Sequence, residues 1–231
     1  MTLGPQKLTG SGIRFIINKK NNKKIISDFQ SGNIDWSDKN LSTIKGAIRR
    51  LLRKEQDGRC IYCRRRIIKE RKNVYEDIEH YLDKSKKKYK QWAFLSLNLS
   101  LACHACNFQK STKDLGGAHV ITLHSSYPKG IGVYHWLHPH FDNFHDNIEI
   151  RKGWIYVVKS NAPSPIQAQN QISECKLDCI SSIEAHSEKI KNRIFRLTNL
   201  SLRAMKKKKL SLAEALLNES LQYQKDIHFD Y

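Results

Sequence analysis

The stretch that decides the fold begins with Cys60-Ile61-Tyr62-Cys63 and closes, 39 residues later, with Cys103-His104-Ala105-Cys106. Each short pair supplies two sulfur atoms from one tight turn, and two such pairs form a tetrahedral thiolate site for zinc. The usual interval between such pairs is about 15–20 residues. The longer interval here predicts that a substructure is built between the two halves of a structural zinc site.

An acid next to a histidine, Glu79-His80, lies inside this interval, and Asn107 directly follows the last cysteine. Phosphodiester hydrolysis needs a base that takes a proton from water and a cation that stabilises charge on the phosphate. Mg²⁺ prefers a few protein oxygens together with waters and substrate phosphate, and one carboxylate and one amide fit that preference. Because neighbouring side chains of a strand point to opposite faces, we expect Glu79 and His80 at a strand end, where the loop lets both reach one site.

The order of these residues resembles the HNH endonuclease family, whose pattern is an acid-His pair followed by N-L-x-L-x-C-x-x-C-N-x-x-K. The matching residues here are Glu79-His80, Asn98-Leu99, Leu101, Cys103, Cys106, Asn107 and Lys110. The resemblance implies an α+β fold, in which a zinc-stapled ββα-metal finger is flanked by helices and a β-hairpin.

The resemblance also implies roles, residue by residue. His80 would be the general base, Glu79 and Asn107 would hold a catalytic Mg²⁺ or Mn²⁺, and Asn98 would orient the loop after His80. Two positions depart from the family pattern. Glu79 stands where Asp is commoner, and the segment after His80 lacks the proline often found there.

A looser resemblance, to the PtuB-type HNH nucleases of Septu and retron anti-phage systems, extends beyond the finger. It is carried by residues 51–63, Ile78-Glu79-His80, Trp92 and residues 138–142. It implies a toxic effector that hydrolyses DNA, or an RNA such as tRNA, with neither polymer favoured. It further implies an ATPase partner of the PtuA type and, in retron systems, a reverse transcriptase with its msDNA.

Composition favours a nucleic-acid partner. Lysine and arginine number 41 against 22 acids, which gives a net charge of +19, and phosphate neutralisation is the common use of so much positive charge. A solvated basic face, or a surface for an acidic protein, is the alternative. The basic residues expected to contact nucleic acid border the finger: Arg64, Arg65, Arg66, Lys84, Lys86, Lys87, Lys88 and Lys110.

Six cysteines, four of them assigned to zinc, favour a reducing cytosol and therefore a cytoplasmic location. No window of the sequence is apolar enough to predict a membrane span. The alternative to an enzyme is a catalytically silent zinc module that binds nucleic acid or serves as a scaffold. The intact set of Glu79, His80 and Asn107 argues against that alternative.

The rest of the chain is predicted to divide into an N-terminal arm with a basic helix (1–58), the finger (59–117) and a C-terminal hairpin and helical region (118–231). We expect strands at 13–17, 74–78, 97–102 and 120–123, a loop at 18–24, a hairpin at 147–160, and helices at 41–56, 104–113, 166–197 and 210–225. Cys175 and Cys179 would share one helix face as buried thiols. The histidines of 138–145 are expected to pack among aromatic rings, with a second metal site as the less favoured alternative.

Overall fold

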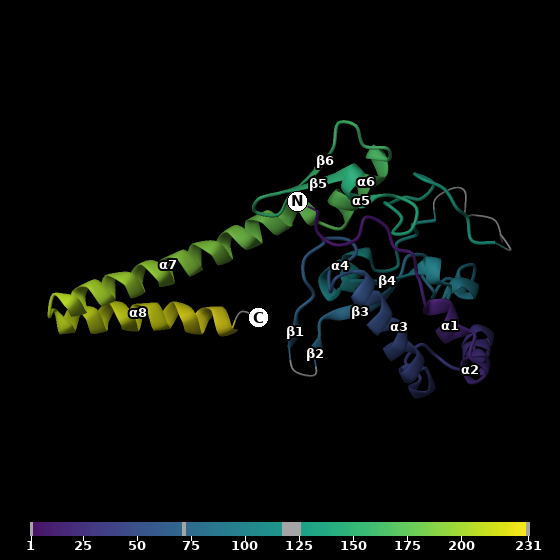
Figure 1. Cartoon of the computed structure of the whole chain (residues 1–231), viewed down its shortest axis with the longest axis horizontal. Coiled ribbons are helices and arrows are strands. Elements are labelled where there is room, and N and C mark those ends of the chain that lie inside the picture. The colour runs from purple at the N-terminus through teal and green to yellow at the C-terminus, as the bar shows by residue number, and fades with distance from the viewer. Residues whose placement is uncertain (1, 71–72, 117–125, 230–231) are drawn as a thin grey trace. The chain divides into compact units, whose positions relative to one another are not determined.

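The computed structural model describes residues 2–70, 73–116 and 126–229 and contains helices together with three short two-stranded sheets, which makes the chain α+β. The chain forms two compact units (Figure 1). The first comprises Met1–Arg151 and Tyr156–Asp178, and the second comprises Lys152–Ile155 and Cys179–Tyr231.

The helices are α1 (Ile13–Ile17), α2 (Lys20–Ser31), α3 (Ser42–Glu55), α4 (His104–Lys110), α5 (Phe144–Asn147), α6 (Pro165–Glu174), α7 (Ile180–Lys206) and α8 (Leu210–Phe229). Short 3-10 turns lie at Lys39–Leu41, Lys90–Trp92, Ser96–Asn98 and Leu177–Cys179. The strands are β1 (Lys69–Glu70), β2 (Asn73–Val74), β3 (Glu76–His80), β4 (Leu99–Cys103), β5 (Ile148–Arg151) and β6 (Ile155–Val158).

The central sheet joins β3 to β4 in antiparallel register, from the pair Glu76–Cys103 to the pair His80–Leu99. Helix α4 follows β4 without a loop, because Cys103 ends the strand and serves as the N-cap of the helix. The order strand, strand, helix that the sequence predicts is therefore present, with boundaries shifted by a few residues.

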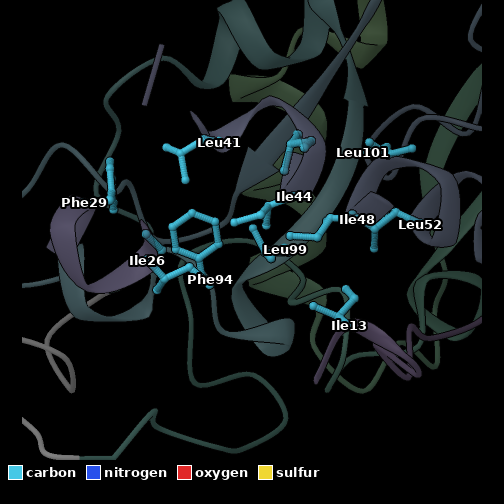
Figure 2. Close-up of a cluster of buried hydrophobic side chains, with 12 residues drawn as sticks. Ile13, Ile26, Phe29, Leu41, Ile44, Ile48, Leu52, Phe94, Leu99 and Leu101 are labelled. Carbon is cyan, nitrogen blue, oxygen red and sulfur yellow. The ribbon is translucent and has the colours of Figure 1, made fainter. Parts of the chain in front are cut away.

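The main core lies between this sheet and the N-terminal helices (Figure 2). Helix α3 contributes Ile44, Ile48 and Leu52, which recur every four residues and so share one face of the helix. They pack with Leu99 and Leu101 of β4, all at 1% exposure or less. The other members of the core are Ile13, Ile26, Phe29, Leu41, Ile78, Ala93 and Phe94.

A buried amide fixes the end of α3 to the sheet. The Gln56 side chain donates to the Leu101 carbonyl at 2.9 Å and accepts from the Leu101 N–H at 2.7 Å. The backbone of Ile61 also donates to the Leu101 carbonyl. These bonds hold the approach to the first cysteine pair against the strand that leads to the second.

Two N-terminal expectations were wrong. The segment 13–17, expected as a strand, is helix α1, and the loop expected at 18–24 belongs largely to α2. The isoleucines of 13–17 suit a strand by local preference, but Ile13 is fully buried among helices of the core. The only buried residues of helix α2 are Ile26 and Phe29. Because the first half of the helix is polar, the sequence shows no long apolar repeat there that would predict a helix.

The histidine-rich block packs among aromatic rings, as expected. His138 is fully buried, lies 4.4 Å from the Tyr81 ring and 4.3 Å from the Phe141 ring, and hydrogen-bonds the Tyr127 hydroxyl at 2.9 Å. The Tyr81 hydroxyl donates to the Trp136 carbonyl at 2.7 Å. His138 is therefore a packing group, and His140 and His145 hydrogen-bond the carbonyls of Leu99 and Leu3.

The expected hairpin is confirmed as β5 and β6. The expected helix at 166–197 is interrupted: α6 ends at Glu174, Lys176 has a positive φ of 55°, and α7 begins at Ile180. Because of this break, Cys175 is buried whereas Cys179 is exposed, which corrects the expectation of a shared buried face. The strand expected at 120–123 lies outside the described residues.

Helices α7 and α8 form an antiparallel pair in the second unit (Figure 1). Arg193 pairs with Glu219 at 2.6 Å, and Ser201 donates to the Ala213 carbonyl at 2.8 Å. In the part of the chain that is described, no helix has both the length and the apolar character needed to cross a bilayer.

Candidate functional site

The sulfur atoms of four cysteines lie close together where the turn after α3 meets the start of α4. The Sγ atoms of Cys60, Cys63, Cys103 and Cys106 all lie within 4.8 Å of one another. Cys60 and Cys63 come from the turn after α3, Cys103 ends β4 and Cys106 lies in the first turn of α4. Four sulfur donors at this spacing could hold a metal ion such as zinc. Among the described residues, no other group of three or more His, Cys, Asp or Glu side chains is arranged so that it could hold a metal ion.

Contacts around the cluster hold its two turns in place. Arg64 has a φ of 62°, and its N–H donates to the Cys60 carbonyl at 3.0 Å, which closes the first turn. The Tyr156 hydroxyl donates to the Cys63 carbonyl at 2.6 Å. Cys175 lies against the Cys106 carbonyl at 3.9 Å. The sulfurs are therefore positioned by the fold around them.

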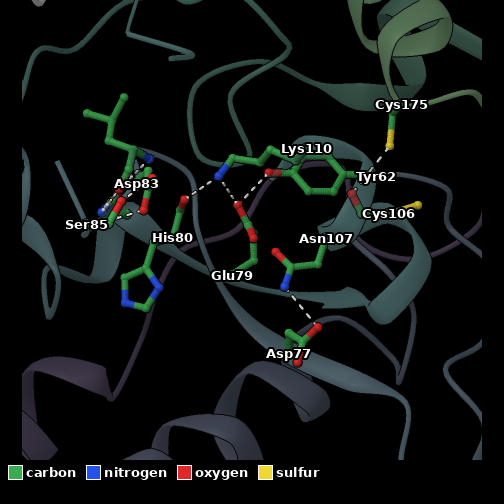
Figure 3. A network of polar contacts seen from close by, with 12 residues as sticks. Tyr62, Asp77, Glu79, His80, Asp83, Ser85, Cys106, Asn107, Lys110 and Cys175 are labelled. Carbon is green, nitrogen blue, oxygen red and sulfur yellow. Dashed lines mark hydrogen bonds and ion pairs between the residues drawn. The ribbon is translucent and has the colours of Figure 1, made fainter. Parts of the chain in front are cut away.

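Glu79 lies on the α4 side of β3 and is engaged in a buried ion pair. Its Oε1 is 2.6 Å from the Lys110 ammonium and accepts from the Tyr62 hydroxyl at 3.1 Å (Figure 3). Lys110 also donates to the His80 carbonyl at 2.8 Å. Burial raises the pKa of Glu79, although Lys110 and Tyr62 act in the opposite direction. Lys110 thus compensates the charge of a carboxylate that has little access to water.

Asn107 reaches the same face of β3 from helix α4. Its Nδ2 donates to the Asp77 carboxylate at 2.9 Å, and His104 Nδ1 lies 3.1 Å from the same oxygen. Figure 3 shows the amide oxygen of Asn107 on the side of Glu79. Asp77 and Glu79 are two residues apart on one strand, so both carboxylates face α4. The structure therefore places Asp77, Glu79 and Asn107 on the same side of β3.

His80 points the other way. Its ring meets the Trp36 ring edge-on, with centroids 4.5 Å apart, and Figure 3 shows it directed away from the Glu79 carboxylate. His80 continues the regular register of β3, so alternation separates it from Glu79, contrary to the expectation that the loop lets both reach one site. Burial, followed by the charges of Lys84 and Lys110, lowers the pKa of His80 well below its usual value. Its Nε2 has no hydrogen-bond partner among the described residues.

Asn98 sits at the centre of the loop that follows His80. Its amide donates to the carbonyls of Leu82 and Trp92, at 3.0 and 3.2 Å, and its Oδ1 accepts from the Leu82 N–H at 2.7 Å. The Tyr127 hydroxyl donates to the same oxygen, and the Asn98 carbonyl accepts from the Tyr81 N–H. Asn98 is fully buried, so these bonds fix the path of the chain on leaving β3.

Two residues expected to contact nucleic acid lie inside the protein. Lys110 is 2% exposed and is committed to Glu79. Arg64 is also 2% exposed, its guanidinium lies 4.3 Å from the centre of the Phe144 ring, and burial lowers its pKa to about 10. Both expectations are corrected, because neither side chain presents its charge to solvent.

The other basic residues that were expected to contact nucleic acid lie at or near the protein surface. Lys88 is half-buried and pairs with Asp114 at 2.7 Å. Half-buried or exposed positions are occupied by Arg65, Arg66, Lys84, Lys86 and Lys87. On α3, Arg49 lies 3.2 Å from the buried Glu76 carboxylate, and Arg53 pairs with the same group. Part of the basic face of α3 is thus used internally.

Sequence reasoning missed Asp77, His104 and Trp36. The position of Asp77 could have been predicted from the sequence, because strand alternation places it on the same face as Glu79. His104 directly follows Cys103, so its position beside the candidate site could also have been predicted from the sequence. Trp36 lies in a loop, and no local pattern indicates that it would meet His80.

Comparisons of the chain with protein-family models, with curated proteins and with solved structures returned no match.

Proposed function

We propose that the chain is a metal-dependent endonuclease of the HNH type that hydrolyses phosphodiester bonds. One observation carries the proposal. In a strand–strand–helix unit that is joined to four cysteines, β3 carries Glu79 on the face toward α4, with Asn107, and carries His80 at its end on the opposite face, beside the loop that Asn98 fixes. Asn98 bonds the backbone just after His80 on both its N–H and C=O sides, which is the role that the family resemblance implies for it.

His80 suits the role of a general base in its protonation state. Its lowered pKa keeps the imidazole neutral near pH 7, and a neutral imidazole can accept a proton from water. Its Nε2 is buried and has no partner within the protein among the described residues, so a water molecule that reached this atom could donate a hydrogen bond to it. Asn98 fixes the following loop and thereby limits the directions that the His80 ring can take.

The face of β3 opposite His80 has the donor chemistry for a hard divalent cation. Asp77, Glu79 and Asn107 offer carboxylate and amide oxygens, the ligand types that Mg²⁺ and Mn²⁺ prefer. When bound, such a cation would stabilise negative charge on the phosphate and on the leaving oxygen. Lys110 holds the Glu79 carboxylate in place beside Asn107.

The zinc assignment for the four cysteines is part of the same proposal. In this role the ion is structural, because it joins the turn after α3 to the start of α4 and so fixes both ends of the unit. A silent module that binds nucleic acid is the second candidate. It is favoured by the near-complete burial of His80, which is 4% exposed.

The biological setting is proposed on the resemblance to PtuB-type effectors. In that setting the nuclease is the toxic component of an anti-phage system and works with an ATPase partner of the PtuA type, with a reverse transcriptase and msDNA in retron systems. The cytoplasm is the corresponding location. Co-purification of the chain with such an ATPase would test this part independently of the chemistry.

Metal dependence tests the proposed chemistry. Cleavage of plasmid DNA and of bulk tRNA should require added Mg²⁺ or Mn²⁺, and Asn107→Ala should raise the Mg²⁺ concentration needed. The loss should at least match the roughly 10–100-fold that removal of an outer-shell partner costs in metal affinity. Gln109→Ala is the matched control, because Gln109 is exposed on the same helix. Cleavage without a divalent cation, or an Asn107→Ala variant that matches Gln109→Ala, would contradict the proposal.

A further inference from the structure

Trp36 is a half-buried tryptophan in the loop between α2 and the turn before α3. Its ring packs against Phe94 and Phe29 of the core, with centroids 5.4 and 5.8 Å apart. The same ring meets His80 edge-on at 4.5 Å. The core therefore fixes the indole, which stays half-buried, in contact with the ring of the proposed general base.

Two lysines from different elements converge on this ring. The Lys45 ammonium, from α3, lies 5.4 Å from the ring centre, and the Lys84 ammonium, from the loop after β3, lies 5.3 Å from it. Lys45 also donates to the Trp36 carbonyl at 2.7 Å, which fixes its position. Among the described residues, no carboxylate oxygen lies within 4 Å of either ammonium group.

The electrostatic balance around the two lysines favours an anion. Burial lowers the pKa of Lys45, and the charges of Arg49 and Lys84 lower it further, whereas Asp38 acts in the opposite direction. Burial also lowers the pKa of Lys84. Lys110 adds to that effect, and Asp83, Glu79 and Asp77 oppose it. Cations held close together in a partly dry setting repel one another, and a bound phosphate would relieve that repulsion.

We propose that Trp36, Lys45 and Lys84 form a binding subsite for one unpaired nucleotide, whose phosphate pairs with the two ammonium groups and whose base stacks on the Trp36 ring in the place that they leave. The inference rests on the proposed nuclease function and names its substrate class as single-stranded or looped nucleic acid. A base in a duplex already has both faces stacked, so it must leave the stack to reach Trp36. The His80 ring, whose Nε2 has no hydrogen-bond partner among the described residues, lies edge-on to the Trp36 ring, which puts the bound nucleotide near the proposed base.

Fluorescence anisotropy with short labelled oligonucleotides tests the subsite, in buffer without added Mg²⁺ or Mn²⁺. The probes are a single-stranded DNA, a single-stranded RNA and a duplex of the same sequence. Stacking on an aromatic side chain contributes about 1–3 kcal/mol per base, so Trp36→Leu should weaken single-strand binding by roughly 5–150-fold. Duplex binding should change by less than about twofold. Trp36→Phe, which keeps an aromatic face, should retain most of the affinity.

The lysines are tested against a matched charge control. Lys45→Met and Lys84→Met should each weaken single-strand binding and flatten its dependence on salt, because each removes a phosphate contact. Lys39→Met removes one exposed lysine for which no contact with the Trp36 ring is seen among the described residues, and it should have a smaller effect. Phe15→Leu is the control for loss of an exposed aromatic residue, since Phe15 is 80% exposed.

Several results would overturn the subsite. They are unchanged single-strand binding by Trp36→Leu, equal losses for single strands and duplex, or lysine variants that match Lys39→Met. If Trp36→Leu fails to fold, the comparison of Lys45→Met with Lys39→Met still decides. The two proposals fail separately: a Trp36-independent nuclease would refute only the subsite, and Trp36-dependent binding without cleavage would refute only the nuclease.

Discussion

The Lys110 ammonium lies 2.6 Å from the Glu79 carboxylate, and both side chains are 3% exposed. Removing one partner of a buried pair leaves an uncompensated charge, which typically costs about 3–5 kcal/mol. Lys110→Met should therefore lower the free energy of unfolding by roughly this amount near pH 7. Lys87→Met, at an exposed lysine, should change it by less than about 0.5 kcal/mol. Urea denaturation measures both variants.

The cost of Lys110→Met should depend on pH in a defined direction. Burial already raises the pKa of Glu79, and loss of Lys110 removes an influence that lowers it, so the pKa rises further in the variant. A folded-state pKa above the unfolded value stabilises the fold at low pH and loses that effect as pH rises through it. The variant should thus be closer to wild type at about pH 5 than at about pH 7. A difference that does not change with pH would contradict this account of the pair.

The four-cysteine cluster should bind one metal ion per chain. Cys103→Ser should abolish binding and lower the melting temperature, because a bound ion would join the two turns that carry the strand–strand–helix unit. Elemental analysis of the purified proteins gives the metal content. Cys179→Ser is the control, since Cys179 is exposed and lies outside the cluster. Metal retained in Cys103→Ser, or absent from wild type, would refute the site.

Asn98 should matter for both stability and cleavage. Asn98→Ala leaves the backbone groups of Leu82 and Trp92 without their buried partners, and each such group costs about 1–3 kcal/mol. The loop after His80 would then lose its fixed path, so cleavage should fall by more than the folded fraction does. Asn33→Ala, at an exposed position, should leave both unchanged. Activity that follows the folded fraction alone would argue against a positioning role.

The acid limb of the pH–rate profile should lie below the usual histidine pKa of about 6.5. Burial and the charges of Lys84 and Lys110 lower the pKa of His80, so the neutral base persists into acidic solution. Lys84→Met removes one of these charges and should move the limb toward higher pH. Lys39→Met should leave it in place. A limb at or above pH 6.5 in wild type would contradict the assignment of His80.

The central part of the fold was predictable because its signals are local. Two C-x-x-C pairs predict the convergence of Cys60, Cys63, Cys103 and Cys106, and apolar spacing predicts the buried face of α3. The helix over 13–17 was not predictable from local preference, because isoleucines also suit strands and only the surrounding core selects the helix. The break between α6 and α7 at Lys176 was not predictable either, because no glycine or proline lies there to indicate the end of a helix.

The candidate site was predictable in its residues but not in its directions. Glu79 and His80 are neighbours in the sequence, but in the regular register of β3 their side chains point to opposite faces of the strand. Charge alone could not indicate which cations lie inside. Lys110 and Arg64 are buried by tertiary contacts with Glu79 and Phe144, while Lys87, in a similar basic run, remains exposed. Trp36 reaches His80 from a distant loop, and such contacts depend on the complete fold.

The most direct test of the nuclease is a cleavage assay of wild type and His80→Ala on plasmid DNA and bulk tRNA, with Mg²⁺ and with EDTA. A general base contributes about 10²–10⁴-fold to rate, so His80→Ala should lose cleavage by that factor while it keeps its bound metal and its fold. Cutting of one polymer by wild type in Mg²⁺ alone would also identify the substrate. A folded, metal-loaded His80→Ala that cuts as fast as wild type would contradict the central claim.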